Sequence, residues 1–300
     1  MGFRTIVISR PCKLSYKNES LVIRGEDSLI VHLNEIATLI IDSSMVTLTA
    51  YLLCALLQHK IKVVLCDEAR NPLGEMVSYY GSHDTSGQLR DQLRWADERK
   101  GMVWQLIIRQ KILNQSALLQ TEHPEESRML RYYALEVMPH DETNREGHAA
   151  KVYFNRVFGP DFSRSLASDI NSALNYGYAL LLSTMNKEIV ARGYITQLGI
   201  HHCNTFNHFN LSSDFMEPLR HLIDRRVLSL GEKPFDKECK RALLNVFSDP
   251  LRYRGRLLYL NETVAQYVGV LTDALESDNA LMEEMVIIGE DTSNACYCTV

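Results

Sequence analysis

The feature that most constrains the fold is a change of hydrophobic periodicity along the chain. Before residue 68, short runs rich in β-branched residues alternate with polar turns, a pattern typical of strands. These runs cover residues 5–9, 13–16, 21–24, 29–33, 38–42 and 61–66. After residue 87 the apolar residues recur with the 3.6-residue period of helices. One chain with both periods is neither all-α nor all-β, and we predict an α+β fold.

Turn-forming residues between the two patterns indicate a domain boundary. Residues 71–87 hold an Asn-Pro pair, three glycines and several serines, and we expect them to form an interdomain linker. Residues 1–70 then form a small N-terminal β-sandwich-like domain that includes one helix over residues 46–58. Residues 88–300 form a larger all-helical catalytic domain.

The helical part contains several recognisable amphipathic or apolar segments. Trp95, Met102, Leu106 and Leu113 lie on one helical stripe, and residues 170–191 are apolar enough to cross a domain core. Further helices are expected over residues 214–230, 236–247 and 261–275. The acidic tail over residues 289–300 shows no apolar period, and we expect it to be poorly ordered and dispensable.

Composition excludes several classes of protein. The 300 residues are 46% hydrophobic and 23% charged, as in soluble globular proteins. The seven cysteines are scattered, with no C-x-x-C pair, so neither a disulfide framework nor a thiolate zinc site is indicated. No apolar run reaches the length of a membrane span, and we expect a cytoplasmic protein with no membrane partner.

The net charge of −5 does not exclude a nucleic-acid partner, because the charge is unevenly distributed. Residues 257–300 contain eight acidic residues and no basic one, which leaves 32 basic and 29 acidic residues, a net +3, in residues 1–256. Ten of the basic residues crowd one stretch: Arg220, Arg225, Arg226, Lys233, Lys237, Lys240, Arg241, Arg252, Arg254 and Arg256. Such a cluster is typical either of phosphate binding or of a solvated helical surface.

Three segments place acid-base or metal-binding side chains beside predicted helices. Glu146 follows the helix cap Asn144, although stability alone also favours an acid in a first turn. Next, the segment 199–204 holds a histidine pair, of which one member usually packs against the protein. Asp214 and Glu217 share a helix face, and Pro218 predicts a start or kink of that helix near Met216.

A glutamate, a histidine and a second glutamate from separate helices are a donor set suited to Mg²⁺ or Mn²⁺. Two ionised glutamates close together repel each other, so we expect their site to attract a cation. By the same reasoning, removing either glutamate should leave stability unchanged or raise it. The motifs H-E-x-x-H, G-x-S-x-G, G-x-x-x-x-G-K-[ST] and G-x-G-x-x-G are absent from the sequence, which excludes the chemistries that depend on them.

Three strings resemble the Cas1 family of CRISPR-associated integrases, within it the branch that accompanies Cas9 (type II) systems. They are NREGHAAKVYF (144–154), NSALNYGYALLLS (171–183) and GIHHCNTFNHFNLSSDFMEPLR (199–220). In that family a glutamate, a histidine that ends a Gly-x-x-His element, and an acid bind the catalytic metal. The resemblance therefore implies Glu146, His202 and Glu217 as catalytic and metal-binding residues, whereas His201 and His208 do not fit the spacing.

The resemblance also implies residues around this triad. Asp214, twelve residues after His202, would orient that histidine or a metal-bound water, and a plain helix acid is the alternative. Arg145, Lys151, Arg220 and Arg225 are expected to contact the DNA backbone. The segment 204–210 departs from the family pattern, so the DNA contacts of this loop are not predicted.

The resemblance implies an integrase that joins the 3′-hydroxyl ends of a prespacer to a CRISPR repeat by transesterification with Mg²⁺ or Mn²⁺. Its partners would be double-stranded DNA, a second copy of the chain in a homodimer, and a Cas2 dimer in a larger complex in the bacterial cytoplasm. Cas9 and an additional adaptation protein are further candidates. Two alternatives stay open: a metal-dependent DNA nuclease, and a catalytically silent DNA-binding scaffold of the same fold.

Overall fold

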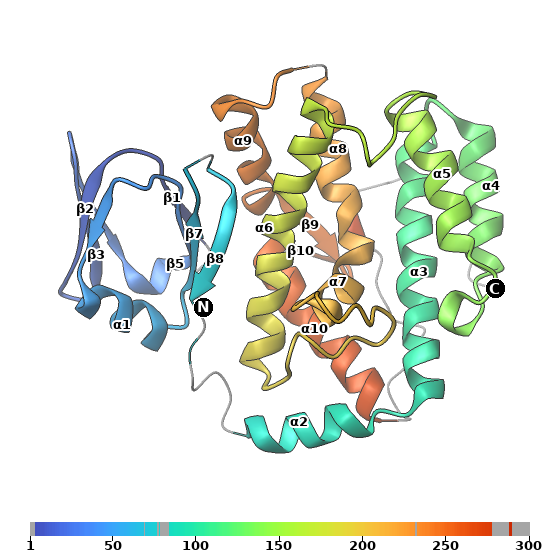
Figure 1. The fold of residues 1–300 in the computed structure, drawn as a ribbon, viewed down its shortest axis with the longest axis horizontal. Coiled ribbons are helices and arrows are strands. Elements are labelled where there is room, and N and C mark those ends of the chain that lie inside the picture. The colour runs from blue at the N-terminus through green and yellow to red at the C-terminus, as the bar shows by residue number, and fades with distance from the viewer. Residues whose placement is uncertain are drawn as a thin grey trace.

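The protein is an α+β protein, as predicted, with a strand-rich N-terminal region followed by a mainly helical region (Figure 1). The computed structural model describes residues 4–68, 70–76, 78, 84–231, 233–277 and 288–289. Among the described residues, none of the helices combines the length and the apolar character needed to cross a membrane.

Two four-stranded sheets build the N-terminal region, with strand orders β1-β5-β7-β8 and β4-β3-β2-β6. β1 and β7 run parallel to β5, and β8 is antiparallel to β7. In the second sheet β2, β3 and β4 are antiparallel neighbours, and β6 runs parallel to β2. The strands are β1 (Arg4–Ile8), β2 (Cys12–Lys17), β3 (Ser20–Arg24), β4 (Ser28–His32), β5 (Ile36–Ile41), β6 (Val46–Leu48), β7 (Lys62–Cys66) and β8 (Pro72–Met76).

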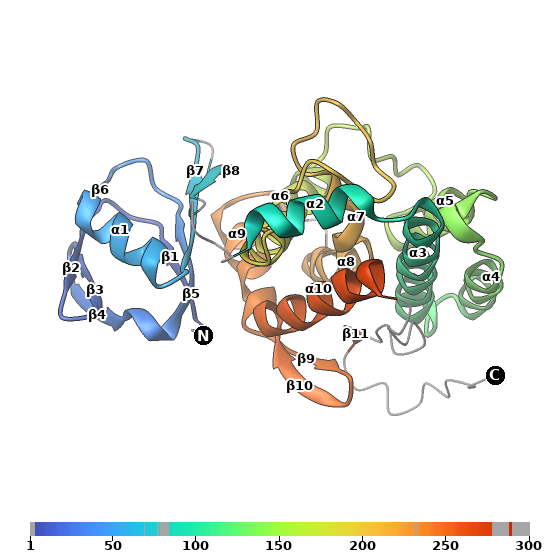
Figure 2. The same ribbon diagram turned by 90° about the horizontal axis from the view of Figure 1, so that it is seen from below.

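The two sheets face each other across a shared apolar core, with α1 (Ala50–Gln58) at its side (Figure 2). Leu14 and Leu21 of one sheet, Leu39 and Val63 of the other, and Leu52 of α1 are fully buried there. The six predicted strands are all present. The helix predicted over residues 46–58 is too long, because its first residues pair with β2 as β6.

The first sheet also packs against the helical region. All six residues of β5 are buried, as expected for a parallel strand covered on both faces. Behind it, the Ser183 hydroxyl donates to the Glu75 carboxylate on β8 (2.8 Å), and Glu75 pairs with the buried Lys62. The segment 71–87, predicted as an interdomain linker, therefore contributes a strand to this contact.

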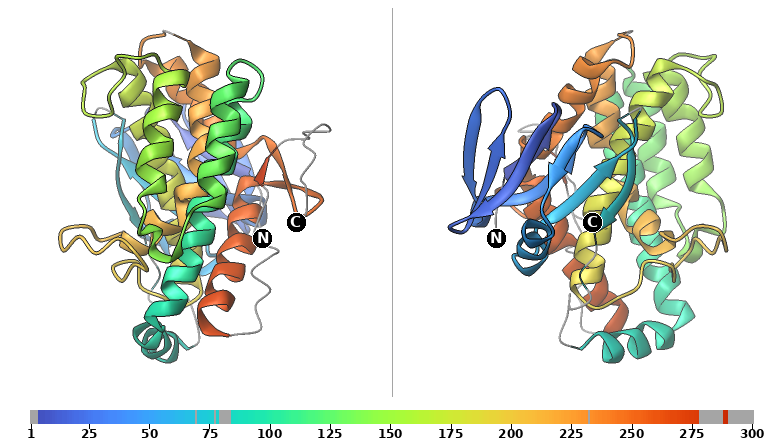
Figure 3. Two further views of the ribbon diagram at one scale, coloured as in Figure 1. Left: turned by 90° about the vertical axis from the view of Figure 1, so that its right-hand side faces the viewer. Right: turned by 60° about the vertical axis from the view of Figure 1, so that its left-hand side comes forward.

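The helical region is built around α3 and α6, each of 23 residues. Its helices are α2 (Thr85–Arg94), α3 (Asp97–Leu119), α4 (Pro124–Leu135), α5 (Arg145–Val157), α6 (Asp169–Ala191), α7 (Asn210–Met216), α8 (Arg220–Leu230), α9 (Lys237–Leu244) and α10 (Leu260–Glu276). Figure 3 shows α3, α4 and α5 side by side, away from the N-terminal sheets. The observed α6 confirms the core helix predicted over residues 170–191.

Two details of the helical prediction are wrong. The buried face of α3 carries Val103, Trp104, Ile107, Ile108 and Ile112, whereas Met102 of the predicted stripe is 44% exposed. α3 contacts α4, α5, α8 and α10, so its apolar residues do not form a single stripe.

The region is also not all-helical, because it contains the hairpin β9 (Pro250–Tyr253) and β10 (Arg256–Tyr259), with β11 (Ile288–Gly289) beside β9. The tail prediction concerns residues that, apart from Gly289, lie outside those described.

Candidate active site

Glu146 stands in the first turn of α5, and the start of this helix is fixed by two neighbouring side chains. The Asn144 side chain accepts a hydrogen bond from the Gly147 N–H (3.3 Å), as predicted for the helix cap. The Asp141 carboxylate accepts the N–H groups of Arg145 (2.8 Å) and Glu146 (2.9 Å). With its backbone held in this way, Glu146 extends its carboxylate to the Lys111 ammonium on α3, 2.5 Å away.

Glu217 lies where Pro218 interrupts the helix, at the 3-10 turn Glu217–Leu219 between α7 and α8. This interruption confirms the predicted kink. The carboxylate is only 4% exposed and pairs with Lys111 (2.6 Å) and Arg220 (2.9 Å). Burial opposes ionisation of Glu217, but Arg220 and Lys111 outweigh it and lower its pKa to about 2. Glu217 is therefore a buried anion at neutral pH.

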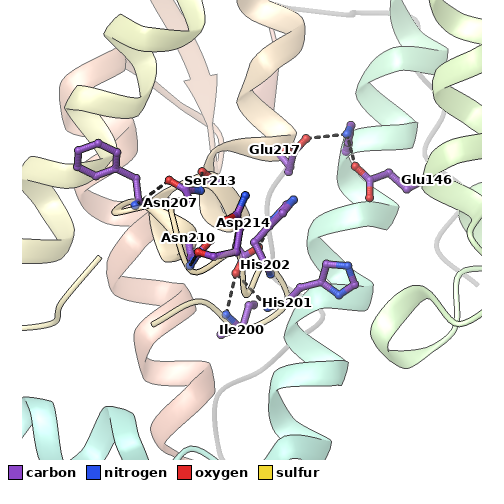
Figure 4. Close-up of polar contacts among 12 residues, drawn as sticks. Glu146, Ile200, His201, His202, Asn207, Asn210, Ser213, Asp214 and Glu217 are labelled. Carbon is purple, nitrogen blue, oxygen red and sulfur yellow. Dashed lines mark hydrogen bonds and ion pairs between the residues drawn. The ribbon is translucent and has the colours of Figure 1, made fainter. Parts of the chain in front are cut away.

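Lys111 connects the two glutamates, as Figure 4 shows for the side chains of Glu146 and Glu217. Burial lowers the pKa of Lys111, but the two carboxylates outweigh this effect and the pKa is raised overall. The two glutamates were expected to attract a cation, and here a cation from the chain itself lies between them.

His202 is held by Asp214, which is fully buried. The Asp214 carboxylate accepts the backbone N–H groups of Ile200 (2.7 Å), His201 (3.0 Å) and His202 (3.0 Å) (Figure 4). It also contacts Nδ1 of the His202 ring at 2.5 Å, and this hydrogen bond, despite burial, raises the pKa of His202. Nε2 is thus the ring nitrogen available to a ligand. Asp214 was expected to orient His202, to orient a metal-bound water or to be a plain helix acid, and its contact with Nδ1 of His202 fits the first of these.

The loop that carries the two histidines begins with Gly199, because a side chain at this position would not fit. A Cβ atom on this residue would lie 2.4 Å from the carbonyl oxygen of His202 and 2.7 Å from Asp214 Oδ2. Trp104 of α3 closes the loop from the other side, since its ring stacks on His201 (centroids 4.2 Å apart) and meets the edge of His202 (5.7 Å). The two neighbouring histidines thus differ in role: His201 packs, and His202 is oriented.

The side chains of Glu146, Glu217 and His202 can be compared with the ligands that divalent metal ions prefer. Within the part of the chain that the structure describes, no three acidic, histidine or cysteine side chains already form a metal-binding cluster. Two carboxylates nevertheless converge on one cation position, and both raise the pKa of the nearby His202. Oxygen ligands with one imidazole oriented through Nδ1 are a donor set that fits Mg²⁺ or Mn²⁺.

A pocket of about 260 Å³ adjoins the two glutamates. Lys111, Arg164 and Arg220 line it together with Tyr178. Both arginines lie over the Tyr178 ring, Arg220 at 4.7 Å and Arg164 at 5.3 Å from its centroid. A pocket with three cationic side chains next to a carboxylate pair can hold a phosphate group beside a divalent cation.

The other predicted DNA-binding residues are not gathered at this pocket. Arg145 pairs with Glu136 (3.0 Å), and Lys151 is exposed on α5. Arg225 lines a separate pocket together with Arg226. Of the predicted basic residues, only Arg220 reaches the carboxylate site.

Three residues of the site escaped the sequence analysis: Trp104, Lys111 and Arg164. A weak signal exists for Lys111, a charged residue four positions after the buried Ile107 and therefore on the same face of α3. Trp104 and Lys111 are seven residues apart and so share one helix face. No local signal indicates Arg164, which comes from the segment between α5 and α6.

Comparison with known proteins identifies the family. The family model described as "CRISPR associated protein Cas1" matches residues 5–242. The chain is 37% identical over 235 residues to the CRISPR-associated endonuclease Cas1 of Neisseria meningitidis serogroup C (strain 8013), covering 78% of this chain and 77% of that protein.

Solved structures share the fold. A chain of the Cas6-RT-Cas1--Cas2 complex matches with a TM-score of 0.71 at 20% identity, over 95% of this chain and 36% of that chain. A casposase bound to integration product matches with a TM-score of 0.68 at 18% identity, over 91% of this chain and 90% of that chain. Since the family model spans most of the sequence, the chain belongs to the Cas1 family of CRISPR-associated endonucleases and integrases, as its motifs predicted.

Proposed function

We propose that the protein joins the 3′-hydroxyl ends of a double-stranded prespacer to a CRISPR repeat by metal-dependent transesterification. The observation that carries the proposal is the convergence of Glu146 and Glu217, from different helices, on one cation position beside a cationic pocket. The similarity to a casposase described as bound to its integration product supports joining over hydrolysis.

Glu146, His202 and Glu217 would hold Mg²⁺ or Mn²⁺, which when bound supplies Lewis acidity to the attacking hydroxyl and to the phosphorus centre. Arg164 and Arg220 bind the oxygens of the scissile phosphate and align it for in-line attack. A bond forms between the prespacer 3′-oxygen and the phosphorus at the 5′ end of a repeat strand, and the bond from that phosphorus to the 3′-oxygen of the preceding nucleotide breaks. The attacking hydroxyl loses a proton and the leaving 3′-oxygen gains one. Asp214 keeps the His202 ring in position throughout.

The assembly is part of the proposal. The match to a chain of a complex named Cas6-RT-Cas1--Cas2 supports a Cas2 dimer as partner. Integration at both ends of a repeat requires paired active sites, which a homodimer on each side of Cas2 would supply. Cas9, an additional adaptation protein and the bacterial cytoplasm as the place of action follow from the sequence resemblance alone.

A nuclease is the second candidate, because the Neisseria meningitidis relative is named an endonuclease. The same residues would then act with water as the nucleophile in place of the 3′-hydroxyl.

The test incubates the protein with Cas2, Mn²⁺, a duplex with 3′-hydroxyl ends and a plasmid that carries the repeat. Strands joined through a branched intermediate mean integration, free 5′-phosphate ends mean hydrolysis, and DNA binding without either product means a silent scaffold. Glu146→Gln, His202→Ala and Glu217→Gln should each abolish joining. His208→Ala is the matched control, since His208 is an exposed histidine of the same loop.

A further inference from the structure

The contacts of Lys111 place its ammonium where the two glutamates meet. The Nζ atom lies 2.5 Å from Glu146 Oε1 and 2.6 Å from Glu217 Oε2, so the two carboxylate oxygens are within about 5 Å of each other. The lysine side chain is 12% exposed. Such a bridge holds both carboxylates in place and neutralises part of their charge.

A divalent cation bound by both glutamates would need the same position. Metal–oxygen bonds are about 2.0–2.1 Å long for Mg²⁺, so an ion held by both carboxylates would need the space that the Lys111 ammonium now occupies. An ammonium and a divalent cation repel each other strongly at such a separation in a partly buried site. The two cations are therefore mutually exclusive at this carboxylate pair.

The Lys111 ammonium can move to a second position when it leaves the glutamates. Its side chain lines the 260 Å³ pocket, and its four-carbon stem can turn the ammonium into that space. Glu217 keeps a cationic partner when Lys111 leaves, because its Oε1 atom contacts Arg220 at 2.9 Å. Exchange of one cation for the other thus leaves no buried carboxylate without a counter-charge.

We propose that Lys111 is an internal counter-ion that occupies the carboxylate pair in the absence of a divalent cation and gives way when the cation binds. This inference rests on the metal site of the proposed function and adds a regulation to it. The lysine preserves the geometry of the site before metal binding and weakens the affinity for the metal. The site is therefore occupied by a divalent cation only when the concentration of that cation is high enough.

Isothermal titration with Mn²⁺ alone, without DNA, tests the proposal. In Lys111→Met the competing ammonium is gone, and we expect the dissociation constant for Mn²⁺ to fall at least tenfold relative to the unmodified protein. Lys100→Met is the matched control, because it removes one positive charge from the same helix outside the site and should leave the constant unchanged. Equal dissociation constants in the unmodified protein and Lys111→Met would overturn the proposal.

The same titration separates this inference from the proposed function. If Mn²⁺ binds neither the unmodified protein nor Lys111→Met, or binds Glu146→Gln as well as the unmodified protein, the metal site itself is wrong. If Lys111→Met does not fold without metal, a crystal structure of the unmodified protein with Mn²⁺ decides the matter. The Lys111 ammonium should then have left Glu146, and an ion bound to both glutamates with the two lysine contacts retained would overturn the proposal.

Discussion

Replacing Glu217 by glutamine should destabilise the protein, contrary to the expectation from charge repulsion alone. Glutamine keeps the size of the side chain but removes the charge that Lys111 and Arg220 both contact. Lys111 is 12% exposed and Arg220 29% exposed, so neither cation can recover full hydration. The repulsion argument fails because the site contains a lysine between its carboxylates.

Two routes give a similar magnitude for Glu217→Gln. The pKa of Glu217 falls from its usual 4.5 to about 2, which at about 1.36 kcal/mol per pKa unit corresponds to about 3 kcal/mol at neutral pH. Removing one partner of a buried ion pair typically costs about 3–5 kcal/mol. We therefore expect the free energy of unfolding to fall by about 3 kcal/mol at pH 7.

Urea unfolding followed by circular dichroism, in buffer with EDTA, measures this loss. Glu142→Gln is the control, since Glu142 is exposed and should change stability by no more than about 0.5 kcal/mol. The double variant Lys111→Met with Glu217→Gln should lose less than the sum of the two single variants, because the pair is removed together. A Glu217→Gln protein as stable as the control would refute the reasoning.

Three further predictions concern histidines and their neighbours. Asp214→Asn removes the charged acceptor of His202, so an NMR titration should show the pKa of His202 lowered; an unchanged value would contradict the assigned cause. Burial lowers the pKa of His221 to about 4, so between pH 6.5 and 4 the unfolded chain binds more protons than the folded protein. The free energy of unfolding therefore decreases as the pH is lowered through this range. His221→Gln should reduce the loss between pH 7 and 4.5 by about 2–3 kcal/mol, and an equal loss in both proteins would exclude His221. His202→Asp should shift the preference in strand joining from Mn²⁺ towards Mg²⁺ by about tenfold, and an active variant with unchanged preference would remove His202 from the ligands.

The fold was predictable where the local pattern and the final environment agree. β5 and α6 are rich in apolar residues and become the buried centres of their layers. The hairpin of β9 and β10 was not predicted, because its strands have only four residues each and its turn is unusual. Arg254 and Gly255 form the turn, and both adopt positive φ (48° and 76°). Such a turn is predicted from sequence when the pair is Asn-Gly, and Arg-Gly does not give this signal.

The site was predictable only in part. Glu146, Glu217 and His202 belong to strings that resemble a family, and the helix cap at Asn144 and the kink at Pro218 follow from local chemistry. The bridging role of Lys111 depends on contacts with residues 35 and 106 positions away, which no local pattern encodes. Long-range ion pairs of this kind become visible only when the packing of the helices is known.

The position of α3 also limits how the sequence can change in length. Trp104 touches the histidine loop and Lys111 touches the carboxylate pair, and the two residues are separated by two helical turns, about 10 Å. One inserted or deleted residue between them would rotate Lys111 by about 100° around the helix axis and point it away from both glutamates. Any relative that keeps both contacts must therefore keep the length of the segment from Trp104 to Lys111.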